Sequence, residues 1–355
     1  MAKTRVIGLD IGTTAVRAAQ LEFGAGGPSG TGLVSLTKYG EVPLPLGAVR
    51  DGEVAEIGFV VDALRALWAQ QRFDSKDVVI GVGNQRVVVR ELSLPWMPLN
   101  QLKSTLPFHV QDLLPMSIDE ALLDFYPTSE SEGEHGREVH GMLVAAVRDT
   151  VTTNVLAVES AGLRPVMVDL NAFALHRGMT RGDLADRTVA LVDIGARVTN
   201  VVISAQGIPR FIRMLPTGGQ DGTDAIARAM SLSIPEAEAL KRQIGIGYVV
   251  DPKYANAGEA LHAVTNNLIE AVRNTFVYYS GNNPGAGIEM AVLTGGGAHL
   301  PGLGQYLSSA SRLAVTLGDP LQSVQTSHLA GGRASLVGKE SLMAMAIGLA
   351  YGEAA

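Results

Sequence analysis

Apolar residues in the first quarter of the chain recur with two different spacings, and each spacing predicts one kind of element. The residues from Val6 to Ala19 read as two apolar strands joined by a short turn, and a third strand is expected over residues 33–42. Residues 77–82 read as a further, buried strand. Apolar residues at helical spacing lie between these strands and predict a helix that packs on the sheet: Ile57, Val60, Val61, Leu64, Leu67 and Trp68. The pattern predicts an α/β unit built on a three-stranded meander.

The next 80 or so residues repeat this alternation on a smaller scale. Strands are expected over residues 87–92, 122–126 and 139–147, with a helix over 99–114 that carries Pro107 inside it. A helix over 150–161 then leads into a strand over 166–170. The segment is therefore expected to form a small α/β insert within the first half of the protein.

The triplet Asp-Ile-Gly occurs twice, at Asp10 to Gly12 and at Asp193 to Gly195, each time between two apolar runs. A glycine in such a turn lets backbone N–H groups approach an anionic oxygen closely. Hydroxyl donors from Thr13, Thr14 and Thr199 and the charge of Arg17 are expected to add to these two phosphate-binding turns. A single turn of this kind is common in ordinary hairpins. The repetition favours two halves that close on one phosphate chain.

The two aspartates of these turns are candidates for a metal site. Mg²⁺ prefers octahedral oxygen coordination and keeps several of its waters, so carboxylates on opposite walls can hold the hydrated ion between them. We therefore expect Asp10 and Asp193 to face Mg²⁺ through water.

A third glycine motif follows the apolar run at residues 291–293. Gly295, Gly296 and Gly297 are consecutive, which costs chain entropy and indicates that something needs a flat, close backbone surface. A nucleoside is the natural candidate for that surface.

The order of two phosphate turns and a glycine run resembles the actin-like ATPase superfamily. The resemblance implies two RNase-H-like half-domains around a cleft that binds ATP and Mg²⁺, with a small α/β insert of the FtsA type (subdomain 1C) in the first half. We predict the first half over residues 1–84 and 165–187, the insert over 85–164, and the second half over 188–355. The chain contains no Gly-x-x-x-x-Gly-Lys-Ser/Thr motif, so a P-loop is not supported.

Composition narrows the classes of partner and compartment. The net charge of −7, with no cluster of Lys and Arg, argues against nucleic acid as the main partner. The chain has no cysteine, which excludes disulfides and thiolate metal sites. A strand is expected almost at once after Met1, and no run of eighteen apolar residues is present, so we expect a cytoplasmic protein without direct membrane insertion.

The insert resembles the PilM family of type IV pilus assembly proteins. The matching stretches are Leu94-Pro-Trp-Met-Pro98, Leu123-Asp-Phe125, Leu143-Val-Ala-Ala-Val147, Ala161-Gly-Leu-Arg-Pro165 and Val168-Asp-Leu170, and the resemblance continues to Ala350. It implies an ATP-binding protein held at the inner membrane by the cytoplasmic N-terminal tail of a PilN-like single-pass membrane protein. Other pilus platform and motor proteins, and further copies of the chain, are the other partners that it implies.

The tail of the partner is expected to dock as an extended apolar peptide between the first half and the insert. Four apolar residues are candidates for this groove or, alternatively, for the core of the insert: Leu94, Trp96, Met97 and Leu106.

The resemblance also assigns positions in the second half. Gly218 and Gly219 match the stretch that approaches the phosphates and ribose, where the amino terminus of a following helix is expected to favour an anion. Glu238 and Lys241 match residues beside the ribose and adenine, and their spacing puts them on one helix face. An ordinary surface ion pair has the same spacing.

Two departures from actin bear on turnover. Ala196 and Asn200 stand in the second turn where actin has a carboxylate and an imidazole that help to orient the attacking water. Phosphoryl transfer needs a positioned nucleophile as well as clamps for phosphate and metal. The sequence therefore predicts ATP binding with slow hydrolysis or none.

Two other functions fit the same superfamily. An FtsA-like cell-division protein would share the insert. A small-molecule kinase would need a carboxylate base beside an acceptor pocket, for which Asp221 and Asp224 are the candidates.

Overall fold

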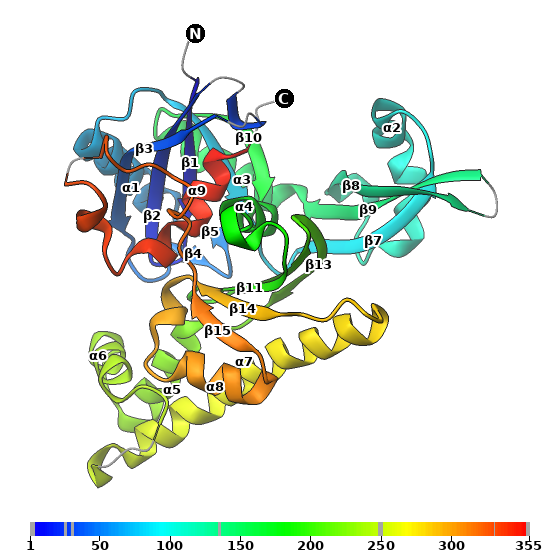
Figure 1. Cartoon of the computed structure of the whole chain (residues 1–355). Coiled ribbons are helices and arrows are strands. Elements are labelled where there is room, and N and C mark those ends of the chain that lie inside the picture. Colours follow the sequence, from blue (N-terminus) through cyan, green and yellow to red (C-terminus); the bar gives the residue numbers. More distant parts are fainter. Residues whose placement is uncertain are drawn as a thin grey trace.

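Two five-stranded sheets and a projecting three-stranded sheet organise the computed structural model of the chain (Figure 1). The structure describes residues 4–24, 27–29, 32–133, 136–247, 251–329 and 331–352. Each large sheet is the centre of one lobe, and the two lobes lie one above the other in Figure 1, with the third sheet projecting to the side.

The first lobe is built on the sheet β10-β6-β1-β2-β3. Its strands are β1 (Thr4–Ile11), β2 (Ala15–Phe23), β3 (Val34–Pro43), β6 (Asp77–Val82) and β10 (Arg164–Leu170). Strands β1, β2 and β3 form the expected antiparallel meander, and β6 pairs in parallel with both β1 and β10. Helices α1 (Ile57–Gln71) and α3 (Arg148–Ser160) supply apolar residues to the core on one face. A two-stranded ribbon of β4 (Val49–Arg50) and β5 (Glu53–Val54) borders this core.

The second lobe repeats that topology in the sheet β13-β12-β11-β14-β15. Its strands are β11 (Thr188–Ile194), β12 (Thr199–Ala205), β13 (Ile208–Leu215), β14 (Met290–Thr294) and β15 (Ala314–Leu317). Again three antiparallel strands are followed by two parallel ones. Helices α7 (Ala255–Asn282) and α8 (Leu303–Ser311) cover one face, while α5 (Gly219–Met230) and α6 (Ile234–Ile244) pack beside α7. Each Asp-Ile-Gly turn therefore follows the central strand of its own sheet.

Two short helices join the lobes. Helix α4 (Asn171–Met179) follows the last strand of the first sheet, and α9 (Ala344–Ala350) lies near the end of the chain. Their apolar residues share one core with residues of both sheets. The two helices approach so closely that a Cβ on Gly348 would lie 1.8 Å from the carbonyl oxygen of Ala174. Helix α9 also packs on β1 and β2, so the end of the segment that we assign to the second half lies against the first sheet.

Within the range predicted for the insert, residues 85–164, the projecting part is a sheet in the order β7-β9-β8 with one helix on it, whereas α3 of the same range packs in the core of the first lobe. The elements of the projecting part are β7 (Val87–Pro95), α2 (Leu99–Val110), β8 (Ala121–Gly133) and β9 (Gly136–Val147). Strand β8 was predicted over residues 122–126 but extends to Gly133. The additional residues are mostly exposed and polar, and they pair with β9 beyond the part of the hairpin that packs on α2. The helix is shorter than predicted, since it tightens into a 3₁₀ turn at Gln111. Within the described residues, no helix is both long and apolar enough to cross a membrane.

Candidate functional site

The two Asp-Ile-Gly turns face one cavity of about 400 Å³ between the lobes. Its walls bring together 13 of the 15 residues that the sequence predicts for a nucleotide site: Asp10, Gly12, Thr13, Thr14, Arg17, Asp193, Gly195, Gly219, Glu238, Lys241, Gly295, Gly296 and Gly297. A second cavity of about 560 Å³ shares several of these residues and is also lined by Gly218. Thr199 lines neither cavity.

The turns themselves have the same backbone geometry. The N–H of Gly12 donates to the carbonyl of Ala15 at 3.0 Å, and the N–H of Gly195 donates to that of Val198 at 3.0 Å. The residue opposite each aspartate differs, however, because Asp10 pairs with Arg17 and Asp193 pairs with Asn200. One turn thus carries a cation beside its carboxylate and the other carries an amide.

Both aspartates are poorly solvated. Burial raises the pKa of Asp10 to about 6, the Arg17 guanidinium opposes this rise, and the charge of Asp193 adds to it. Burial also raises the pKa of Asp193, against hydrogen bonds donated by Thr294 and Asn200. Two buried carboxylates whose charged forms are disfavoured by burial are the electrostatic environment in which a cation binds.

Two amide oxygens in the same cavity have no hydrogen-bond partner in the described structure. These are Oδ1 of Asn171, at the start of α4, and Oδ1 of Asn200, opposite Asp193. A buried carbonyl oxygen needs a donor, and the waters of a hydrated Mg²⁺ are strong donors. The four oxygen-bearing side chains of Asp10, Asp193, Asn171 and Asn200 therefore fit a hydrated divalent cation. Asn171 could not be predicted from the sequence, because a lone Asn between a strand and a helix carries no distinct signal.

The second turn is packed tightly against the start of α5. A Cβ on Gly218 would lie 2.5 Å from the carbonyl oxygen of Gly195, so only glycine fits there. The N–H groups of Gly219 and Gln220 donate to the carbonyls of Gly195 and Ala196 at 2.9 and 2.8 Å. The N–H groups of the first two helix residues are therefore not free to bind an anion, because the second turn already accepts those bonds, and an anion contact at this helix start stays a prediction.

The hydroxyl of Thr199 is also used within the protein. It donates to the carbonyl of Thr217 at 2.8 Å, and the residue is fully buried. We expected a phosphate donor at this position, and the structure corrects that expectation, because the hydroxyl fixes the second hairpin to the loop before α5. Thr13 and Thr14 do line the cavity.

Glu238 and Lys241 lie on one face of α6 as predicted, 2.6 Å apart. The ammonium of Lys241 also donates to the carbonyl of Gly219 and the hydroxyl of Thr223, both at 2.8 Å. Glu238 accepts a further bond from Arg242. The pair is more than a surface ion pair, since it ties α6 to α5 at the wall of both cavities.

The three consecutive glycines pack against the second turn as well as lining the cavity. Gly295 has a φ of +80°, and a Cβ there would lie 2.9 Å from Oδ1 of Asp193 and 2.5 Å from the carbonyl oxygen of Ile194. The preceding Thr294 donates to Oδ1 of Asp193 at 2.9 Å. Close packing on Asp193 therefore accounts for part of the glycine requirement, and contact with a nucleoside stays a prediction.

The two carboxylates considered as kinase bases are already engaged. Arg197 contacts Asp221 at 2.7 Å and Asp224 at 2.6 Å. Asp221 also accepts the N–H of Gly218 as part of the start of α5. Both carboxylates therefore act within the structure, which removes the basis for the kinase alternative.

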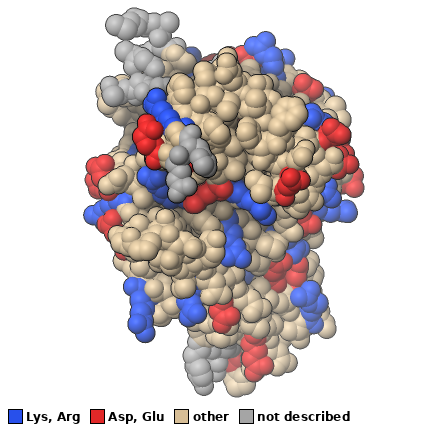
Figure 2. Space-filling view, turned by 90° about the vertical axis from the view of Figure 1, so that its right-hand side faces the viewer, with Lys and Arg blue, Asp and Glu red and all other residues tan. Residues whose placement is uncertain are grey.

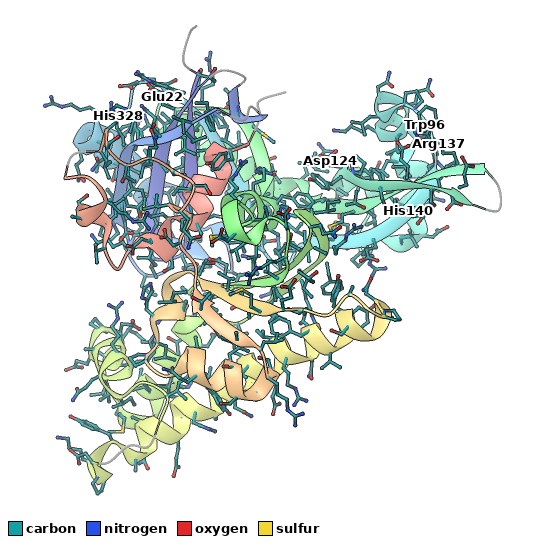
Figure 3. The ribbon with its side chains drawn as sticks, in the orientation of Figure 1. Glu22, Trp96, Asp124, Arg137, His140 and His328 are labelled. Atoms are coloured by element: carbon teal, nitrogen blue, oxygen red, sulfur yellow. The ribbon has the colours of Figure 1, made fainter. Side chains whose placement is uncertain are left out.

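The four apolar residues considered for partner binding divide into two classes. Leu94 and Leu106 are buried in the core of the insert, so the core interpretation holds for them and they are not accessible to a peptide. Met97 packs at the margin of this core. Trp96 is 44% exposed, and the guanidinium of Arg137 stacks on its ring at 4.8 Å from the centroid. Figure 3 places both residues on the outer part of the insert.

The surface of the insert combines scattered charge with exposed apolar side chains. On the face that Figure 2 shows, acidic and basic residues are interspersed between wide uncharged areas. The most exposed large apolar side chain of the insert is Phe108, which is 80% exposed on α2, and Leu99 is also exposed on that helix. Exposed aromatic residues of this kind are typical of contact surfaces.

Comparison with known proteins identifies relatives over the whole chain. The family model of the type IV pilus assembly protein PilM matches residues 8–353. Cell division protein FtsA of Bacillus subtilis (strain 168) is 29% identical over 182 residues, which are 47% of this chain, and the match spans only 41% of the length of FtsA.

Solved structures give the same picture. A structure of the PilM-PilN type IV pilus biogenesis complex matches with a TM-score of 0.82 and 26% identity, covering 98% of both chains. MreB5 of Spiroplasma citri bound to ADP matches with a TM-score of 0.54 and 13% identity, covering 97% of this chain and 94% of that one. The second likeness concerns the fold alone. Together they confirm the two-lobed actin-like fold that the sequence predicts.

Proposed function

Because the chain belongs to the PilM family of type IV pilus assembly proteins, we propose that it is the cytoplasmic ATP-binding component of a pilus assembly platform at the inner membrane. The observation that carries this proposal is the match over 98% of the chain to a PilM-PilN complex. FtsA supports a division role less well, since its match covers 47% of the chain.

In this proposal the cavity between the lobes binds ATP with Mg²⁺. The glycine-containing turns and the hydroxyls of Thr13 and Thr14 contact the phosphates, while Asp10 and Asp193 hold the metal through water. The unpartnered amide oxygens of Asn171 and Asn200 accept hydrogen bonds from the same waters. The carboxylates of the cleft repel the negatively charged phosphates, and bound Mg²⁺ would offset this repulsion.

The proposed site binds ATP more readily than it hydrolyses it. Ala196 has no functional group to offer the attacking water, and Asn200 offers an amide, which is not a general base. Incubation with Mg²⁺ and ATP should therefore release phosphate at well below one turnover per second, the lower end of ordinary enzymes. Fast release that Asp193→Ala abolishes would contradict this part of the proposal.

The proposed partner is the cytoplasmic N-terminal tail of a PilN-like membrane protein, with other platform and motor proteins and further copies of the chain as additional partners. Trp96, at the outer part of the insert, is the candidate contact that remains accessible. Met97 is only partly accessible. Aromatic residues of this kind often dominate the affinity of small interfaces.

A binding titration with a synthetic tail peptide tests this partner. The peptide should carry the cytoplasmic N-terminal tail of a PilN-like protein from the same organism. Trp96→Ala should weaken binding about tenfold, or about 1.4 kcal/mol, which is more than most interface residues contribute. Val337→Ala, at an exposed apolar position outside the insert, is the matched control and should leave binding unchanged. Full-strength binding by Trp96→Ala would remove this residue from the interface, and no binding by the wild type would contradict the proposed partner.

A further inference from the structure

Three charged side chains form a row across the first sheet. In the strand register, Asp10 on β1 lies directly opposite Arg17 on β2, and Arg17 lies directly opposite Glu41 on β3. Residues that oppose each other in antiparallel strands share one face of the sheet. The row therefore runs from the proposed metal site to the wall of the neighbouring cavity, which Arg17 and Glu41 both line.

Arg17 is held between the two carboxylates. Its Nε donates to Oε2 of Glu41 at 2.6 Å, and its Nη1 lies 3.9 Å from Oδ2 of Asp10. The side chain of Arg17 is only 15% exposed. Solvent therefore screens these interactions less than it would on an open surface, and the charge of Glu41 acts strongly on Arg17.

The other cationic side chains of the cleft are paired too. Lys241 and Arg242 both contact Glu238, at 2.6 and 2.8 Å. Arg17, Lys241 and Arg242 are the Lys and Arg residues that line the two cavities in the part of the chain that the structure describes. A phosphate chain that enters the cleft thus meets cations that carboxylates already neutralise.

We propose that Glu41 lowers the affinity of the cleft for nucleotide phosphate by neutralising Arg17, and so makes tight binding depend on the metal ion. This inference rests on the proposed ATP site. Ionised Asp10, Arg17 and Glu41 together carry a net negative charge, whereas Asp10 and Arg17 alone would be close to neutral and would repel phosphate less. The effect should grow with the number of phosphates on the ligand.

Glu41 can be changed to test this role because few contacts within the fold depend on it. It lies on the edge strand β3, its side chain is 39% exposed, and its hydrogen-bonded side-chain partner among the described residues is Arg17. Glu238, in contrast, holds Thr223 and Lys241 together across two helices. Substituting Glu41 with Gln keeps an acceptor for Nε of Arg17 while removing the charge.

Calorimetric titrations of the full chain with ATP and with ADP, each with Mg²⁺ and with EDTA, test the inference. Glu41→Gln should bind ATP roughly five- to tenfold more tightly than the wild type at low salt, as expected for removing one poorly screened charge. The gain should be larger for ATP than for ADP, larger in EDTA than in Mg²⁺, and smaller at high salt.

Two further variants separate this electrostatic effect from others. Glu259→Gln makes the same chemical change at an exposed position on α7 that lines neither cavity, and its affinity should equal that of the wild type. The double variant Arg17→Gln with Glu41→Gln is compared with Arg17→Gln alone. Removing the charge of Glu41 should increase ATP affinity less in this background than in the wild type, because Arg17 is no longer present to be neutralised.

The possible failures can be told apart. Wild-type binding with an unchanged or weakened affinity in Glu41→Gln, at an unchanged thermal unfolding midpoint, would overturn this inference alone. Absence of nucleotide binding in both the wild type and Glu41→Gln would overturn the proposed ATP site and the inference with it.

Discussion

In the first lobe the residue opposite the turn aspartate Asp10 is Arg17, whereas in the second lobe the residue opposite Asp193 is Asn200. The two sheets have the same strand order and the same turn geometry. The second turn is also fixed to α5 by backbone hydrogen bonds, while the first turn leaves Thr13 and Thr14 at the cavity wall. Two lobes with the same topology therefore contribute differently to the cavity: the first lobe contributes a charged row of side chains, and the second contributes a turn fixed by backbone hydrogen bonds.

A substitution at Gly218 tests how rigid the second turn is. A Cβ there would lie 2.5 Å from a backbone oxygen, which cannot move without shifting the turn. Gly218→Ala should therefore lower the free energy of unfolding by about 3 kcal/mol, the upper part of the range for overpacking. Gly12→Ala in the first turn, where the nearest atom is 3.0 Å away, should cost about 1 kcal/mol. Equal losses in chemical denaturation would show that the two turns are equally rigid.

The junction between the lobes should respond to pH through His176. This side chain on α4 lies 3.0 Å from Ser204 on β12, and burial lowers the pKa of the imidazole to about 4. The unfolded state takes up a proton near pH 6.5 and the folded state does not, so stability is fully present above pH 6.5 and declines as the pH falls toward 4.

Between pH 7 and pH 5 this decline should be about 2 kcal/mol in the free energy of unfolding. Denaturation of the wild type and His176→Gln at both pH values measures it, because the variant lacks the titrating group. The same pH dependence in both proteins would show that His176 does not couple folding to pH.

One hydroxyl from each hairpin, at positions that are not equivalent, should have a different effect when it is removed. Thr199→Val loses the hydrogen bond to Thr217 and should lower the free energy of unfolding by about 1 kcal/mol. Its affinity for ATP should stay close to that of the wild type, because the hydroxyl does not line the cavity. Thr14→Val, at an exposed position on the cavity wall, should leave stability within about 0.5 kcal/mol and weaken ATP binding instead. Denaturation and nucleotide titration of both variants would contradict the comparison if the two effects were exchanged.

Local sequence patterns predict much of the fold, because strands such as β6 and helices such as α1 follow directly from apolar spacing. Features that depend on how elements meet were harder to predict. The pairing of Glu41 with Arg17 depends on the β2–β3 register, which shifts at an irregularity after Gln20. Asn171 enters the cavity only because β10 lies beside β6, where its side chain covers Gly81 and Gly83.

The same limit applies to the insert. Alternation indicates that Leu94 faces one side of its strand, but it does not say which side α2 covers. The structure shows that α2 covers the side of Leu94, which together with Leu106 becomes core and leaves Trp96 outside.

We propose above all that Asp10 and Asp193, one from each lobe, together hold the metal ion that brings ATP into the cleft. Calorimetric titration of the wild type, Asp10→Asn and Asp193→Asn with ATP, in Mg²⁺ and in EDTA, tests this proposal. We expect Mg²⁺ to strengthen ATP binding to the wild type and either substitution to remove most of this strengthening. Equal strengthening by Mg²⁺ in all three proteins, or no ATP binding by any of them, would contradict the proposal.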